Sequence, residues 1–144
     1  MRALFVRGGL PCLRHLSLIY EQTEDELLEE FQGDDSPTIT TEILSQLADS
    51  HPQLLQLCIA GDVSWLTSSI DNSSARVIAS MAELERLELS CRTNIGDHGF
   101  RRLVTGLPCL ETLELKTSAL TDAALIWLAK RPRLQVRGSA WTWI

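Results

Sequence analysis

One short leucine motif recurs along the chain, and it constrains the possible fold more than any other feature. Residues 10–18 and 107–115 share the pattern LPCLxxLxL, related copies occur at 51–59 and 81–89, and a degenerate one occurs at 131–136. The first strand leucines of the five copies are Leu13, Leu54, Leu84, Leu110 and Leu134. Their spacings are 41, 30, 26 and 24 residues. Three of these periods are of ordinary repeat length, which predicts a repeat architecture with one insertion in the first interval.

A second pattern occupies the intervals between the leucine motifs. Residues 95–103 superpose on 120–128 with a constant offset of 25, and both have apolar residues three apart after an aspartate. Apolar residues at this spacing after Asp or Thr predict a short helix whose first turn is capped by a side-chain oxygen. We therefore expect Asp97 and Asp122 to be helix-start residues. Each unit consists of a helix, a loop and a strand.

Burial explains how such units would assemble. The second and third leucines of LxxLxL face inward, and the helix presents its apolar stripe to the same core, yet one unit cannot bury that surface alone. We expect an α/β solenoid of about four to five repeats, with short parallel strands on the concave face and helices on the convex face of a right-handed β–α arc. Residues 1–144 form one domain in this interpretation. Residues 20–36 are an acidic insertion loop, and 137–144 are a C-terminal cap or tail.

The units resemble the cysteine-containing type of leucine-rich repeat, because LxxLxL is followed by I-x-D-x-x-F-x-x-L. The clearest match runs from Leu84 to Leu115, and weaker copies extend over most of the chain. Such repeats form the substrate-receptor halves of F-box proteins, in which a separate F-box segment attaches to a cullin-type ubiquitin ligase. No F-box pattern occurs in this sequence, so a ligase role is implied by the repeat type alone. The slot that usually holds Cys or Asn is occupied by Glu21, Asp62, Arg92 and Ser118, which puts the usual side-chain ladder in doubt.

The first residues of the sequence continue the helix pattern. Ala3, Val6 and Leu10 occupy the apolar slots of the later helices, so the chain starts inside a unit whose strand is absent. We therefore expect it to be the C-terminal part of a longer solenoid, with N-terminal repeats or an F-box region missing. The alternatives are a truncated gene model and a protein whose first unit docks on a partner.

Charge is distributed unevenly along the chain, whose formal net charge is -6. Residues 15–75 include twelve acidic and no basic residues, whereas residues 76–144 include ten basic and seven acidic ones. The acidic stretch would repel phosphate, so we expect no nucleic-acid partner for the surface as a whole. A smaller basic patch remains available, formed by Arg101, Arg102, Lys130, Arg131 and Arg133.

Cysteine spacing and hydropathy limit the other classes of function. The four cysteines lie far apart, with neither metal-ligand spacing nor a compact disulfide framework, so we expect reduced thiols, no metal and no cofactor. Cys12 and Cys109 are repeat-equivalent, and we expect them to pack at a loop-to-strand junction. No apolar run approaches the roughly 18 residues of a membrane helix, and Arg7 interrupts the first one. We therefore expect no membrane partner and a cytoplasmic or nuclear location.

Outward-facing strand residues are the candidate binding site for a protein partner. In LxxLxL, the residue between the inward leucines and the residues two positions away from it point to the free face of the sheet. The slots are His15, Ser17 and Ile19; Gln56, Cys58 and Ala60; Arg86, Glu88 and Ser90; and Thr112, Glu114 and Lys116. Equivalent slots become lateral neighbours, so Arg86, Glu88, Glu114 and Lys116 are expected to form a charged group of mixed sign. The alternative is that these charges only solvate the face and pair with one another.

Catalytic patterns are absent from the sequence. GxSxG, HExxH, GxGxxG and GxxxxGKS do not occur. His15 and Cys58 could form a thiolate pair on adjacent strands, but two unrelated surface residues are the simpler interpretation. We expect no catalytic residue, and a protein–protein interaction module, most concretely the substrate-recognition repeats of an F-box-type ligase receptor. The rivals are a free-standing repeat scaffold or inhibitor, a structural fragment, and an enzyme with an unrecognised site.

Overall fold

The computed structural model describes residues 12–19, 39–61, 70–117 and 119–138, without the side chain of Arg92. Strands and helices alternate along these residues, as the predicted units require. The elements are β1 (His15–Ile19), α1 (Thr41–Ser50), β2 (Gln56–Ala60), α3 (Asn72–Ile78), β3 (Arg86–Thr93), α4 (Asp97–Gly106), β4 (Thr112–Thr117), α5 (Ala123–Ala129) and β5 (Gln135–Arg137).

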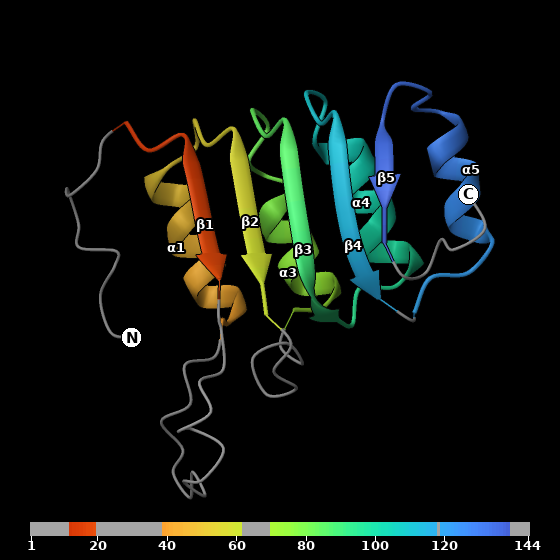
Figure 1. Ribbon diagram of the computed structural model, residues 1–144, viewed down its shortest axis with the longest axis horizontal. Helices are drawn as coiled ribbons and strands as arrows, with labels where there is room; N and C mark the ends of the chain where they lie inside the picture. The colour runs from red at the N-terminus through yellow and green to blue at the C-terminus, as the bar shows by residue number, and fades with distance from the viewer. Residues whose placement is uncertain (1–11, 20–38, 62–69, 118, 139–144) are drawn as a thin grey trace, which may run out of the picture.

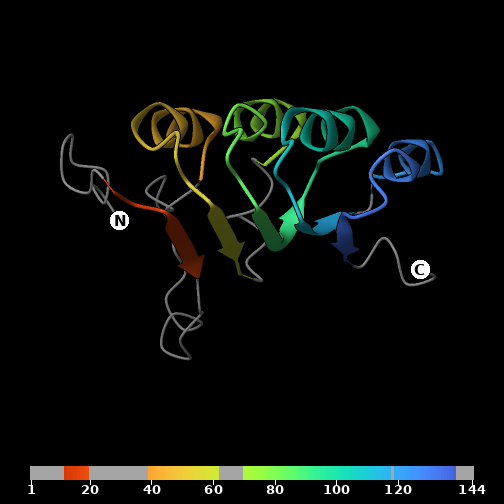
Figure 2. The same cartoon turned by 90° about the horizontal axis from the view of Figure 1, so that it is seen from above.

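The five strands form one parallel sheet in the order β1-β2-β3-β4-β5, so every strand pairs with its neighbours in sequence (Figure 1). The four described helices lie side by side on one face of this sheet (Figure 2). On the other face, no described helix covers the strands. This arrangement confirms the predicted α/β class, the parallel strands and the placement of the helices on one side.

The core lies between the sheet and the helix layer. Leu57, Leu87 and Leu113 are paired in register on β2, β3 and β4, and each is at most 1% exposed. Phe100 and Leu103 of α4 are equally buried and complete the core from the helix side. The inward positions predicted from LxxLxL and from the helix pattern are therefore confirmed for the central units.

Burial is less complete in the first and last described units. Leu16 and Leu18 of β1, and Leu128 and Val136 around β5, are only partly buried although they occupy the same slots as fully buried residues. A repeat buries its apolar residues against neighbours on both sides, so a unit with one described neighbour is less buried.

Asp97 and Asp122 lie at the starts of α4 and α5, as predicted, but the expected capping by their side chains is not observed. Gly96 precedes α4 and has no side chain, and Asp122 precedes α5 without a capping hydrogen bond. The first N–H group of α5, that of Ala123, donates instead to the Thr121 hydroxyl at 3.3 Å. The carboxylate of Asp97 instead accepts hydrogen bonds from the backbone N–H and the hydroxyl of Thr121, at 2.8 and 2.5 Å. The Asp97 carboxylate therefore binds the loop before α5, in the next unit, and does not cap its own helix. Side-chain caps do form at Thr40 before α1 and at Asp71 before α3, as expected for Thr and Asp.

Polar contacts between consecutive units occur at the first residue of each of three helices. Besides Asp97, the hydroxyl of Thr41 lies 3.0 Å from that of Ser74 in the next unit. Asn72 Oδ1 accepts the N–H groups of Gly96 and Gly99, both at 3.0 Å. A Cβ at Gly99 would collide with this same oxygen, so the contact requires glycine there. The usual side-chain ladder of such repeats was in doubt because its slot is occupied by other residue types. The structure has a row of contacts at a different slot, the first residue of each helix, which we did not predict.

Candidate partner-binding face

The strand register places equivalent outward residues side by side on the face of the sheet opposite the helices. The first row contains His15, Gln56, Arg86, Thr112 and Gln135. The second row contains Ser17, Cys58, Glu88, Glu114 and Arg137. Both predicted rows are confirmed as lateral neighbours on β1 to β4. Gln135 and Arg137 extend them, and we missed these two residues even though the fifth leucine motif was visible.

The third row departs from the prediction. Ile19, Ala60 and Ser90 are paired as expected, but Lys116 pairs with Arg92 and not with Ser90. Two residues of β3 between Leu89 and Arg92 have no counterpart in β4, which is a bulge. An insertion of two residues preserves the inward and outward alternation, so Cys91 remains buried. The bulge therefore moves Lys116 out of the row without disturbing the core.

A polar network joins the three rows. Arg86 Nη2 lies 3.4 Å from Glu88 Oε2, and these side chains are 53% and 23% exposed. Ser90 Oγ lies 3.1 Å from Glu88 Oε1 and 2.8 Å from Glu114 Oε1. Because a hydroxyl has one proton, Ser90 can donate fully to only one carboxylate at a time. We call Arg86, Glu88, Ser90 and Glu114 the central network; it has two carboxylates at directly paired positions and one bound cation.

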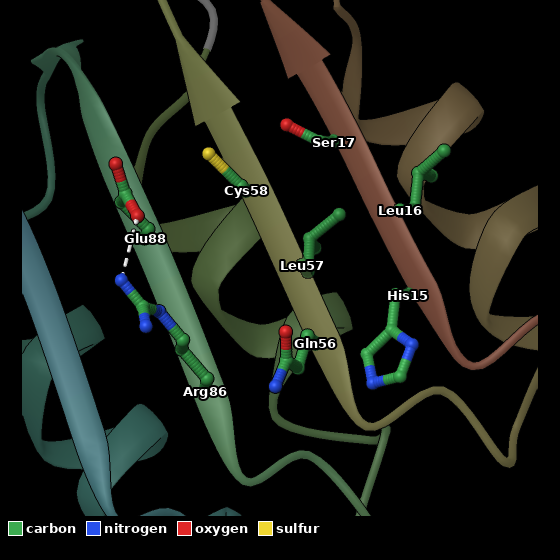
Figure 3. Close-up of a pocket in the computed structure, with 8 residues that line it drawn as sticks. All are labelled: His15, Leu16, Ser17, Gln56, Leu57, Cys58, Arg86 and Glu88. Carbon is green, nitrogen blue, oxygen red and sulfur yellow. Dashed lines mark hydrogen bonds and ion pairs between the residues drawn. The ribbon is translucent and has the colours of Figure 1, made fainter.

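A hollow of about 270 Å³ lies next to the central network, over β1, β2 and β3 (Figure 3). Its lining residues are His15, Leu16, Ser17, Gln56, Leu57, Cys58, Arg86 and Glu88. Figure 3 shows Ser17, Cys58 and Glu88 in one line across the strands, and His15, Gln56 and Arg86 in the next. Pockets for drug-sized ligands measure roughly 300–1,000 Å³. The hollow lies at the lower edge of this range.

The chemistry of Cys58 differs from that of a thiolate nucleophile. Partial burial raises the pKa of the Cys58 thiol; a hydrogen bond with Ser17 lowers it by less, and the negative charge of Glu88 raises it by less again. A nucleophilic cysteine requires the opposite shift. The register also places Ser17 beside Cys58, whereas His15 lies opposite Gln56. His15 and Cys58 are therefore not direct neighbours, and the thiol stays protonated.

The other three cysteines occupy two kinds of environment. Cys91 is fully buried in the core, and burial raises its pKa to about 11. Cys12 and Cys109 are exposed, so their predicted packing at a loop-to-strand junction is wrong. Both lie in surface turns directly after a proline, and the turn directs the side chain outward. All four cysteines are free thiols in the structure.

Cys91 makes the stability of the protein sensitive to alkaline pH. Its pKa rises from an ordinary value of 9.0 to about 11, so the folded protein retains a proton that the unfolded chain releases. This contribution is fully present below about pH 9 and is lost as the pH rises to about 11. We expect the free energy of unfolding from urea titrations to fall by about 2 kcal/mol over this window.

The matched control for this effect is Cys91→Ala. The substitution lowers stability at neutral pH by leaving a cavity, but it removes the titrating thiol. The dependence on alkaline pH should therefore be flatter in Cys91→Ala than in the wild type. Equal slopes in the two proteins would contradict the assignment to Cys91.

The predicted insertion at 20–36 and the predicted helix slots Ala3, Val6 and Leu10 lie outside the described residues. For the predicted tail at 137–144, Arg137 belongs to β5 and residues 139–144 are not described. Within the described part of the chain, no helix is long and apolar enough to cross a membrane. No group of three or more His, Cys, Asp or Glu side chains suited to a metal ion occurs among those residues.

Comparison with known proteins does not extend these observations. Neither a protein-family model nor a curated protein matches this chain.

Proposed function

We propose that the chain is a leucine-rich-repeat arc whose exposed sheet face binds a protein partner. The observation that carries this proposal is the face itself: rows of outward side chains on a parallel sheet that no described helix covers. The repeating leucine motif and the alternation of strands and helices support the repeat type. The central network and the adjacent hollow are the expected contact region.

The properties of this face favour a protein over a small molecule. The hollow is small, and its thiol is protonated. The central network combines a half-exposed arginine with two carboxylates, and mixed charges of this kind give specificity towards a complementary protein surface. The Glu114 carboxylate accepts a hydrogen bond from the Ser90 hydroxyl, which Glu88 shares. It can therefore accept a donor from the bound protein without breaking an ion pair.

The most concrete form of the proposal is the substrate-recognition part of an F-box-type ubiquitin ligase receptor. It rests on the resemblance of the repeats to that family. The rival form is a free-standing repeat scaffold or inhibitor with no ligase link. An F-box reading frame upstream in the genomic sequence, and ligase adaptors among the proteins that co-purify, would favour the first form over the second.

Charge reversal at the central network tests the binding face. The double variant Glu88→Lys/Glu114→Lys replaces both carboxylates by cations that a complementary partner would repel. We expect affinity capture from the source cell to recover about tenfold less of each specific partner. The melting temperature should fall only slightly: the variant loses the Arg86–Glu88 ion pair and the contacts of Ser90, but partly exposed ion pairs contribute at most about 1 kcal/mol.

The control is Asp49→Lys/Glu83→Lys, which makes the same charge change at exposed positions on α1 and in a turn. It should retain the partners that the wild type captures. Equal recovery with the network variant and the wild type would exclude this face as the contact region.

A further inference from the structure

An aromatic ring with two cations lies on the helix layer, at the α4–α5 end of the protein. Arg101 Cζ of α4 is 4.6 Å from the centroid of the Trp127 ring on α5, and Lys130 Nζ is 4.2 Å from it. Cations at these distances are held over the ring by its quadrupole. We call Arg101, Trp127 and Lys130 the Trp127 cluster. It belongs to the opposite layer from the central network, so the proposed function does not use it.

The cluster has an apolar neighbour and no counter-ion among the described residues. Ile126 is 61% exposed, and it precedes Lys130 by four residues, so the two share a helix face. No carboxylate in the described part of the chain pairs with Arg101 or Lys130. Arg102 is exposed on α4 next to Arg101. The surface thus offers positive charge beside an exposed aliphatic side chain and a partly buried aromatic ring.

Arg131 is not part of this surface, although we expected it in the basic patch. Its guanidinium donates four hydrogen bonds to backbone carbonyls around the end of α4. Its charge is therefore used within the fold. The cations that remain for a ligand are those of Arg101, Lys130 and the exposed Arg102 and Arg133.

The ligand that fits such a surface is an acidic chain that also has apolar side chains. The protein has a segment with this composition: residues 21–35 contain eight acidic and no basic residues, together with Leu27, Leu28 and Phe31. Carboxylates would pair with Arg101 and Lys130, and the apolar side chains would cover Ile126 and Trp127. Nucleic acid is the weaker candidate, because a phosphate backbone can pair with the cations but has no aliphatic side chain to cover the exposed Ile126.

Distance along the sheet argues against binding of this segment within one copy. It is attached to β1 and α1, whereas the cluster lies on α4 and α5 (Figure 1). Three helix spacings of roughly 9 Å separate α1 from α5, and half of residues 20–38 extends over roughly 30 Å only when fully stretched. A second copy supplies the segment unstretched; the cost is then the translational and rotational freedom lost on association, so the contact depends on protein concentration. We propose that the Trp127 cluster binds the acidic segment 21–35 of a second copy of this chain.

Such a contact joins two different surfaces, so it is head-to-tail and allows further copies to add. We expect the purified chain to associate reversibly in sedimentation-velocity experiments, and added salt to weaken the association because exposed charges are screened. The variant Arg101→Gln/Lys130→Gln should raise the apparent dissociation constant about tenfold or more. The control Arg14→Gln/Arg76→Gln removes the same charge at exposed positions outside the cluster and should associate like the wild type.

A charge-swap experiment tests the pairing directly. Arg101→Glu/Lys130→Glu in one protein and Glu26→Lys/Glu30→Lys in another should each lose self-association, and an equimolar mixture should regain it. A fluorescent peptide of residues 20–36 provides a second measurement, and it should bind the wild type but not Arg101→Gln/Lys130→Gln, provided that the variant retains its circular dichroism and melting transition. If the variant does not fold, competition between the peptide and wild-type self-association replaces this comparison.

Three outcomes would overturn the proposal. The first is a wild-type chain that stays monomeric up to its solubility limit. The second is self-association that the cluster variant leaves unchanged. The third is salt-dependent binding of a single-stranded oligonucleotide that the cluster variant abolishes, with no binding of the peptide; this result would assign the cluster to nucleic acid.

Discussion

Replacing Leu87 by alanine is expected to lower the free energy of unfolding by about 3 kcal/mol, within the range measured for buried leucines. Leu87 is fully buried in the central strand β3, and its register partners on either side are Leu57 and Leu113. Neighbouring units fix the backbone on both sides, so the cavity cannot collapse. Urea denaturation with a shared m-value measures the change.

The matched comparison is Leu16→Ala, at the same slot of β1. Leu16 is only partly buried, so less contact is lost and the cost should be less than half that of Leu87→Ala. Equal costs at the two positions would contradict the difference in burial between the first and the central units.

Replacing Arg131 by leucine is expected to cost about 2 kcal/mol, even though an apolar residue suits this slot in other units. Met81 and Leu107 occupy the position equivalent to Arg131, three residues before the first strand leucine, and both are buried. The repeat pattern alone therefore predicts that leucine stabilises the protein. The structure leads to the opposite expectation, because Arg131 Nη1 donates to the carbonyls of Val104 and Leu107 at 2.8 and 3.1 Å.

Arg131 Nη2 extends these contacts to the carbonyls of Pro108 and Leu110, both at 3.1 Å. The last carbonyls of a helix have no partner within the helix, and the negative end of its dipole attracts a cation. Arg131→Lys keeps the charge but not the planar set of donors, so it should cost about 1 kcal/mol. Thermal and urea unfolding measure both variants. A leucine variant as stable as the wild type would show that water replaces the guanidinium without loss.

Local sequence predicted the strands and the rows on the sheet face well. The period-two alternation of LxxLxL determines which strand side chains face the core, and the equal motif lengths align the registers of β1 to β4. This is why Gln56, Arg86 and Thr112 could be placed beside one another from the sequence. The prediction of the rows was wrong only at Lys116, because nothing in the leucine motif indicates the two-residue bulge in β3.

Polar side chains were predicted less well, because their partners lie in the next unit. Asp97 has the sequence position of a helix cap, but Thr121, 24 residues later, competes successfully for its carboxylate. The role of Asn72 between units was not predicted, since it depends on the N–H groups of Gly96 and Gly99. Helix-capping preferences describe hydrogen bonds between a side chain and the backbone within a few residues of it. They contain no information on donors more than 20 residues away.

The sequence by itself determined the alternation of helix and strand, the inward leucines and the identity of the outward rows, because these depend on periodicity within a unit. Only the tertiary structure decided how the charged and polar groups are used. It joins Glu88 and Glu114 through Ser90, assigns Arg131 to carbonyl groups and places Arg101 over Trp127. Each of these contacts spans two units, and its energy depends on distances of a few ångströms that no repeat pattern specifies.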